Sequence, residues 1–258
     1  MRMTQLQRPV QRAKAVVEYD GTAYRGWQRQ ADGRTVQAAC EAALAAVLRS
    51  EVGIVAAGRT DTGVHARGQV VHFDHAARLA PQELRRAWNA RLPDDIWVAR
   101  LSRARPDFHA RYDARARTYR YRLALGPRAR SPFVRRYAWP IRGSLDWARI
   151  ERATTRLLGS HDFRPFAKGA PPQRAGRPPG ECTVTAARWR RTAEGRALEI
   201  TADRFLRHMV RALVGALVGI GEGRLEPDAI VASLARETPR PRGTYAPPNG
   251  LFLWRVEY

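Results

Sequence analysis

The alternation between Arg117 and Leu125 constrains the fold more than any other stretch of the chain. Tyrosines and leucines occupy every second position there, and mainly arginine and threonine stand between them. Successive side chains of a β-strand point to opposite faces, so the pattern predicts a strand with one buried face. Such a strand needs neighbouring strands and a packed layer on its apolar side, which together require a sheet covered by other elements.

Comparable patterns recur along the chain in a regular order. The first half reads strand, helix, strand, strand, helix, strand, and the second half echoes that order without obvious sequence identity. We therefore expect an α+β fold, with two similar halves that share a mixed, mainly antiparallel sheet and a central basic cleft. The expected strands are 13–19, 52–57, 69–73, 96–99, 117–125, 183–190, 197–201 and 251–256, and the expected helices are 36–48, 81–92, 145–158, 205–220 and 227–234.

The domain organisation follows from the same patterns. Residues 1–11 resemble a flexible basic tail, residues 12–105 form the N-terminal half and residues 106–258 form the C-terminal half. Residues 167–181 are rich in proline, glycine and arginine and nearly lack apolar side chains, which predicts a mobile loop. We expect Thr35 and Ser144 to cap helices, and Pro81 to occupy a first helical position.

Positive charge dominates the composition. The chain has 46 lysine and arginine residues against 24 acidic residues, a net charge of +22, and Lys14 and Lys168 are its only lysines. A GC-rich genome favours arginine but does not remove acidic residues, so we also expect a polyanionic partner. Arginine binds phosphate oxygens and stacks on bases, which favours a nucleic acid. No apolar run reaches transmembrane length and no signal-peptide core is visible, so we expect a cytoplasmic protein without membrane contact.

The segment from Ala57 to Ala66, with the sequence AGRTDTGVHA, places a carboxylate between two predicted strands. Gly58 and Gly63 predict a tight loop, because glycine reaches backbone angles that are closed to other residues. Loops on a rigid scaffold often present functional residues, so Asp61 is a candidate for catalysis. The alternative is an Asx-turn, in which the carboxylate of Asp61 only accepts hydrogen bonds from nearby backbone amides.

Aromatic and cationic residues are interleaved after the first predicted strand. Tyr24 and Trp27 stand among Arg25 and Arg29, a mixture that suits contacts with single-stranded RNA. The alternative for Trp27 is that its ring closes one end of the core.

Arg211 lies in the middle of the apolar helix expected at 205–220. A buried guanidinium is costly unless it is paired and hydrogen-bonded, so it needs an acidic partner. The alternative is that the stem of Arg211 carries its guanidinium out to solvent.

These features together resemble the TruA family of bacterial tRNA pseudouridine synthases. The segment Gly58–Ala66 resembles the signature of that family, and further matching segments follow in family order over nearly the whole chain. They are Tyr19–Gln30, Thr35–Gln37, Phe108–Arg111, Arg117–Tyr121, Gly159–Phe163, His208–Arg211 and Ala246–Leu251. The resemblance implies the pseudouridine synthase fold, and isomerisation of uridine to pseudouridine at positions 38, 39 and 40 in the anticodon stem–loop of tRNA.

The resemblance also implies roles for individual residues. Asp61 corresponds to the catalytic nucleophile, Arg211 to its ion-pair partner, Tyr119 to the active-site tyrosine that stacks on the uracil, and Arg59 to the base-flipping arginine. A carboxylate paired with arginine stays ionised, so it attacks or removes a proton but donates none. Whether Asp61 attacks the base, attacks the ribose or abstracts a sugar proton stays open. The remaining substrate-binding candidates are Arg25, Trp27 and Gln28.

An isomerisation needs no cofactor, and the family acts as a homodimer, which we carry over as an expectation. His65, His72 and His75 lack the spacing of a zinc site, so we expect no metal. Cys40 is expected in the core, and Cys182 receives no role. Two other classes are considered. An RNA-binding module without catalysis would explain the charge and the aromatic residues, and a metal-dependent nuclease would need clustered carboxylates that the sequence lacks.

Overall fold

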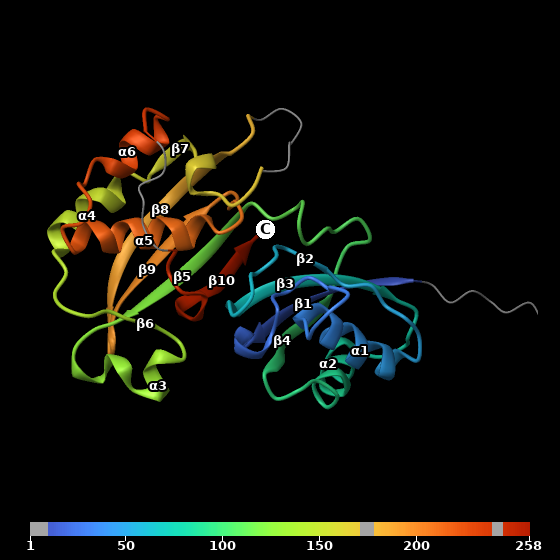
Figure 1. Cartoon of the computed structure of the whole chain (residues 1–258). Coiled ribbons are helices and arrows are strands. Elements are labelled where there is room, and N and C mark those ends of the chain that lie inside the picture. The colour runs from blue at the N-terminus through green and yellow to red at the C-terminus, as the bar shows by residue number, and fades with distance from the viewer. Residues whose placement is uncertain (1–9, 171–177, 239–244) are drawn as a thin grey trace, which may run out of the picture. The chain divides into compact units, whose positions relative to one another are not determined.

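The computed structural model describes residues 10–170, 178–238 and 245–258, and the chain divides into two units (Figure 1). Unit 1 consists of residues 10–114 together with Tyr258, and unit 2 is Arg115–Glu257. Unit 1 thus extends past residue 105, where we expected the first half to end. Hydrogen bonds explain the difference, because Arg12 Nη1 donates to the carbonyl of Phe108 (3.1 Å) and the Tyr258 hydroxyl donates to the carbonyl of Ala110 (2.7 Å).

The strands of unit 1 pair in the order β4-β1-β3, and β2 also pairs with β3. All of these pairings are antiparallel. The strand β1 begins earlier than expected and takes in Gln11, the last residue of the expected tail, whereas residues 1–9 of that tail lie outside the described residues. The bounds are β1 Gln11–Tyr19, β2 Val55–Ala56, β3 His65–His75 and β4 Ile96–Arg103, so β2 is shorter and β3 is longer than predicted.

The helices of unit 1 begin where the sequence predicts. They are α1 (Val36–Leu48) and α2 (Pro81–Asn89), with the short 3-10 helix η1 (Gly21–Ala23) before them. The Thr35 side chain accepts a hydrogen bond from the Ala38 amide (3.4 Å), and Pro81 is the first residue of α2, which confirms both expectations.

Contacts of α2 explain how this helix is held and where it ends. Trp88 Nε1 donates to the carbonyl of Cys40 in α1 (3.1 Å), and Cys40 is fully buried, which confirms its place in the core. The side-chain amide of Asn89 accepts from the amide of Val98 in β4 (2.8 Å) and donates to its carbonyl (3.0 Å). The helix therefore ends at Asn89, before the expected residue 92, because the Asn89 side chain is bonded to the sheet.

The strands of unit 2 pair in the order β10-β5-β9-β8-β7. Each of these pairings is antiparallel, and the short β6 pairs parallel to β5. A mixed, mainly antiparallel arrangement is therefore confirmed, and with the helices of both units it gives an α+β fold. The bounds are β5 Ala116–Ala124, β6 Trp139–Pro140, β7 Gly159–Asp162, β8 Glu181–Thr192, β9 Gly195–Ala202 and β10 Leu251–Glu257. β6 and β7 were not expected.

The helices of unit 2 differ from the expectations at their N-termini. Asp146 rather than Ser144 caps α4, because its carboxylate accepts from the Arg149 amide (3.0 Å). His208 has a left-handed backbone (φ 63°), so α5 begins only at residue 209 and Arg211 lies in its first turn, not in its middle. The helices are α3 Pro132–Arg135, α4 Trp147–Thr155, α5 Met209–Gly221 and α6 Ala229–Leu234, with 3-10 helices η2 Pro127–Arg130, η3 Arg164–Phe166 and η4 Pro248–Gly250.

Part of the loop expected at 167–181 falls on residues 171–177, which lie outside the described residues, and Glu181 already belongs to β8. None of the helices in the described ranges is long and apolar enough to span a membrane.

Candidate active site

The loop that carries Asp61 connects β2 to β3 and is fixed on both sides of that residue. Before it, the carbonyl of Gly58 accepts a hydrogen bond from the side-chain amide of Gln69 (2.7 Å), and Gln69 is fully buried in β3. After it, the amide of Val64 donates to the carbonyl of Asp61 itself (3.1 Å). The loop therefore has a defined path that does not depend on a bound ligand.

Thr60 anchors the loop from within. Its hydroxyl lies 2.8 Å from that of Tyr19, and its carbonyl accepts from the Trp27 amide (3.0 Å). Thr60 is buried, whereas Arg59 is exposed and Asp61 is partly exposed. Thr60 is therefore anchored between the guanidinium of Arg59 and the carboxylate of Asp61. Such a preorganised pair suits chemistry on a bound ligand, because its geometry is fixed before binding.

Two glycines of the segment Tyr19–Gln30 let that segment pass close to this loop. A Cβ atom on Gly21 would lie 2.0 Å from the carbonyl oxygen of Val64, and one on Gly26 would lie 2.7 Å from that of Thr60. Gly26 also has φ +92°, a left-handed backbone that side chains rarely adopt. Both positions therefore need glycine, which gives this part of the sequence motif a structural reason.

The two glycines inside the loop differ from each other. Gly63 has φ 75°, which confirms that it uses backbone angles closed to other residues. Gly58 does not have a positive φ, and a Cβ atom there would meet open space. The expectation that Gly58 needs the freedom of glycine is therefore wrong.

The aromatic residues near the loop are buried. Tyr24 is 1% exposed, its hydroxyl donates to Asp95, and burial raises its pKa well above the ordinary value. Trp27 is 2% exposed, and its ring lies 5.9 Å from that of Tyr19 between centroids. The expectation that Tyr24 contacts RNA is not compatible with this burial, and Trp27 fits the core alternative because its amide supports Thr60.

The cationic candidates of unit 1 lie at the surface. Arg25 and Arg59 are exposed, and Gln28 is half-buried. Within the described ranges, the guanidinium groups of Arg25 and Arg59 have no carboxylate partner, so both are available to bind phosphate. The stem of Arg25 runs beside Gly33, where a Cβ atom would lie 2.5 Å from Arg25 Cδ.

Tyr119 and Arg211 belong to unit 2. Tyr119 is half-buried on β5, edge-on to the ring of Phe205 with 5.0 Å between centroids. Its neighbour Tyr121 is fully buried and donates its hydroxyl hydrogen to the carbonyl of Pro247 (2.7 Å), as expected for a core tyrosine.

Arg211 is half-buried, and its Nε donates to the carbonyl of Ala246 (2.8 Å). The chain around Arg211 is also held to that segment through the reverse bond, from the Ala246 amide to the Arg211 carbonyl (3.0 Å). Asp61 lies in unit 1, so its pairing with Arg211 and its approach to Tyr119 stay predictions.

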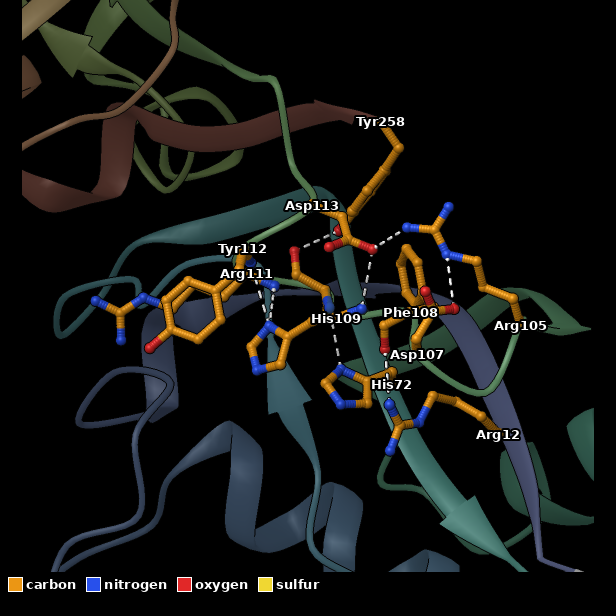
Figure 2. Close-up of polar contacts among 11 residues, drawn as sticks. Arg12, His72, Arg105, Asp107, Phe108, His109, Arg111, Tyr112, Asp113 and Tyr258 are labelled. Atoms are coloured by element: carbon orange, nitrogen blue, oxygen red, sulfur yellow. Dashed lines mark hydrogen bonds and ion pairs between the residues drawn. The ribbon is translucent and has the colours of Figure 1, made fainter. Parts of the chain in front are cut away.

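A second polar cluster in unit 1 surrounds the turn that follows β4 (Figure 2). His72 in β3 is 5% exposed, and its Nδ1 accepts from the Ala110 amide (3.1 Å). Nδ1 of His109 accepts from the amides of Arg111 (3.2 Å) and Tyr112 (3.1 Å). A ring nitrogen that accepts carries no proton, so both imidazoles hold the backbone of this turn through an unprotonated Nδ1.

The same turn is closed by charged residues. The carboxylate of Asp113 accepts from the His109 amide (3.1 Å) and pairs with Arg105 (2.7 Å), as Figure 2 shows. These contacts give the histidines a structural role. In the part of the chain that is described, no three histidine, cysteine or acidic side chains gather in a way that could hold a metal ion.

Known proteins are similar in sequence to this chain over most of its length. The family model described as tRNA pseudouridine synthase matches residues 15–113 and 153–258, which include the Asp61 loop and Arg211. A tRNA pseudouridine synthase A of Moorella thermoacetica is 44% identical over 248 residues, which cover 95% of this chain and 98% of the relative. A protein of the same name from Bacteroides thetaiotaomicron is 40% identical over 253 residues, 96% of this chain and 91% of the relative. The anchored carboxylate loop thus lies within the residues that the family model matches, and the chain belongs to the tRNA pseudouridine synthase family.

Proposed function

We propose that Asp61 is the catalytic carboxylate with which this tRNA pseudouridine synthase converts uridine to pseudouridine, at positions 38, 39 and 40 of the anticodon stem–loop. The observation that carries the proposal is the fixation of the loop. Bonds from buried Gln69, Tyr19 and the Trp27 backbone hold the residues around Asp61, while its carboxylate stays partly exposed. A carboxylate in an anion-binding protein repels phosphate, so a role in catalysis explains why the loop presents it.

The reaction balances without water, oxidant or cofactor. The bond between N1 of uracil and C1′ of the ribose breaks, the base turns over, and a bond from C5 to C1′ replaces it. The proton leaves C5 and N1 gains one, so no net oxidation occurs. An ionised Asp61 serves this sequence by attacking the base, by attacking the ribose or by abstracting a sugar proton.

Other residues support the same step. Tyr119 stacks on the uracil with its hydroxyl near the reacting atoms, and Arg211 pairs with Asp61 and keeps it ionised. Arg59 takes the space that the extruded uridine leaves, which lowers the cost of flipping the base. Arg25 and Gln28 contact the RNA beside it. Trp27 acts as a positioning residue, because its amide holds the carbonyl of Thr60.

We also infer the assembly and location of the enzyme. A tRNA is large compared with a chain of 258 residues, so a homodimer would offer it a continuous basic surface. Because tRNA is the substrate, the protein works in the cytoplasm. Light scattering at micromolar protein concentration tests the assembly, and a strictly monomeric mass would refute it without affecting the assignment of Asp61.

The decisive experiment maps pseudouridine in tRNA incubated with purified wild type and with Asp61→Asn. The variant is nearly isosteric and removes one negative charge, so it should bind tRNA at least as tightly as wild type and form no detectable pseudouridine. Conversion at the wild-type rate would refute the role of Asp61. If wild type itself modifies no tRNA, the hypothesis of an RNA-binding module without catalysis becomes the better one.

Two further variants test the partners from unit 2. Tyr119→Phe keeps the ring and removes the hydroxyl, so tRNA affinity should persist while turnover falls. Arg211→Ala should lower both stability and turnover, because it removes the bond to Ala246 and the proposed ion pair with Asp61. An Arg211→Ala enzyme as active as wild type would exclude the proposed ion pair.

A further inference from the structure

Residues 126–142 of unit 2 form an excursion between β5 and α4, which we call the arginine arm. The arm contains η2, α3 and β6, and α3 with its flanking loops projects from the sheet near β6 (Figure 1). It lies within residues 114–152, the stretch that the family model leaves unmatched. The roles proposed above do not involve any residue of the arm.

The charge of the arm is one-sided. Five arginines occur between residues 126 and 142, and no acidic residue occurs between 114 and 145. All five are exposed. Within the described residues, the guanidinium groups of Arg128, Arg130 and Arg135 have no carboxylate partner. These arginines are therefore exposed positive charges that the protein itself does not neutralise.

Arginines on the sheet of the same unit are arranged differently. Arg120 and Arg188 both pair with Glu199 (2.8 and 2.9 Å), and Arg196 pairs with Glu151 (2.8 Å). The excess of positive charge is therefore not spread evenly over unit 2. The sheet arginines named above each contact a carboxylate, although Arg120 and Arg188 share Glu199. Within the described residues, Arg128, Arg130 and Arg135 contact none, which points to an anionic partner for the arm.

An exposed aromatic ring stands among these cations. Phe133 in α3 is 88% exposed, more than any other large apolar side chain in the described ranges. A single exposed ring contributes nothing to the core, and in water its apolar surface is unfavourable. Rings placed beside arginines are the usual platform on which unpaired bases of single-stranded nucleic acid stack.

The backbone below this surface is fixed. The Asn249 side chain donates to the carbonyls of Arg135 (2.6 Å) and Ala138 (3.2 Å), and the Ile141 amide donates to Ala124 in β5 (3.0 Å). Ala138 is also buried in a small apolar cluster with Ala124. The arm therefore presents its side chains from an ordered backbone, so binding does not have to order the chain first.

We propose that the arginine arm is an RNA-docking surface, on which Arg128, Arg130 and Arg135 contact backbone phosphates and Phe133 stacks on an unpaired base. The proposal rests on the tRNA activity of the family. Charge complementarity selects RNA over a second copy of this chain, because two arms facing each other would repel.

The test compares two double variants that remove the same charge. Arg128→Ala with Arg130→Ala changes the arm, and Arg188→Ala with Arg196→Ala removes arginines that are paired with carboxylates. The affinity for unmodified tRNA is measured over a series of salt concentrations. Each lost phosphate contact should reduce the slope of log K against log salt by about 0.7 to 0.9, so the arm variant should lose about 1.5 and the control much less.

Phe133→Ala separates stacking from charge. This variant should weaken tRNA binding about tenfold without changing the salt slope, because stacking releases no counterions. Its mass in sedimentation should equal that of wild type. A change of mass with unchanged tRNA affinity would show that the arm binds protein and would overturn the proposal. Equal slopes and affinities for the arm variant and the sheet control would overturn it as well.

Activity measurements keep this proposal distinct from the catalytic one. At saturating tRNA, the arm variants should form pseudouridine at the wild-type rate, because the arm acts on affinity alone. Absence of pseudouridine with wild type would refute the proposed catalytic function, yet the salt series would still report on the arm. Because the changed side chains of the arm are exposed, thermal unfolding of the arm variants should match wild type and confirm that they are folded.

Discussion

The Asp61 loop and the arginine arm are both short excursions from a sheet, yet the protein treats their side chains in opposite ways. In the loop, Thr60 next to Asp61 is buried and bonded to Tyr19. In the arm, the backbone is bonded through Asn249, while the arginines and Phe133 extend into solvent.

This difference fits the two functions that we propose, catalysis for the loop and RNA docking for the arm. Bond rearrangement requires a reacting group within a fraction of an ångström of its productive position, so the loop is fixed through buried polar contacts. Docking a long polyanion requires many open positive charges with less strict geometry, because attraction between charges falls off gradually with distance. Changes to the loop should therefore act on turnover, and changes to the arm on affinity.

Among the substitutions that test this comparison, the largest effect is expected at Gly26, behind the loop. Gly26→Ala would place a methyl group 2.7 Å from the Thr60 carbonyl oxygen at φ +92°, so the loop must shift. We expect turnover to fall about 100-fold, as a displacement of about 1 Å at a reacting group would cause. Single-turnover pseudouridine formation measures it. Gly58→Ala is the matched control in the same loop, and an equal loss there would break the comparison.

A smaller effect is expected when the anchor of the loop is weakened. Tyr19→Phe removes the hydroxyl that bonds Thr60, and we expect the free energy of unfolding to fall by about 1 kcal/mol. Urea unfolding followed by fluorescence measures this change. Phe133→Ala in the arm should leave the unfolding free energy unchanged, since its ring is 88% exposed. Equal losses in both variants would contradict the distinction between anchored and open side chains.

The buried imidazole of His72 should make the stability of the protein depend on pH. Burial lowers the pKa of His72 below its ordinary value of 6.5, and the neighbouring His109 and Arg12 act in the same direction, against Asp74 and Asp113. Below pH 6.5, the His72 imidazole therefore binds a proton more readily in the unfolded chain than in the folded chain. The free energy of unfolding should therefore be highest above pH 6.5 and decrease as the pH falls below it.

His72→Gln tests this dependence by thermal or urea unfolding between about pH 5 and 7. The variant should show a flatter pH profile than wild type, although His75, whose pKa burial also lowers, retains part of the slope. The arm has no histidine, so substitutions there should leave the profile unaltered. A His72→Gln profile as steep as that of wild type would exclude His72 as a source of the dependence.

The smallest effect is expected from exchanging arginine for lysine in the arm. Arg128→Lys with Arg130→Lys keeps the positive charge and removes only the fork of donors, so tRNA affinity should fall about twofold. The salt slope should stay that of wild type, in contrast to the alanine variant. A loss as large as that of the alanine variant would show that geometry rather than charge governs the arm.

Much of the candidate site follows from local pattern, because its signals are short in sequence. The Asp61 loop between strands, Cys40 in the core, Thr35 as a cap and Tyr121 as a core tyrosine were each readable from neighbouring residues. The arm was not, because it has neither helical nor strand periodicity, and β6 within it exists only through its pairing with β5.

The sequence by itself therefore determined the α+β class, the order of most elements and the family, since these depend on periodicity and on contiguous motifs. Tertiary structure decided which glycine matters, because the crowding at Gly26 comes from Thr60, far along the chain. It also decided that Gln69 holds the loop and that His72 holds the turn at Ala110. These contacts join residues distant in sequence, and the physical reason is that a buried polar group must find its partner wherever the fold brings one.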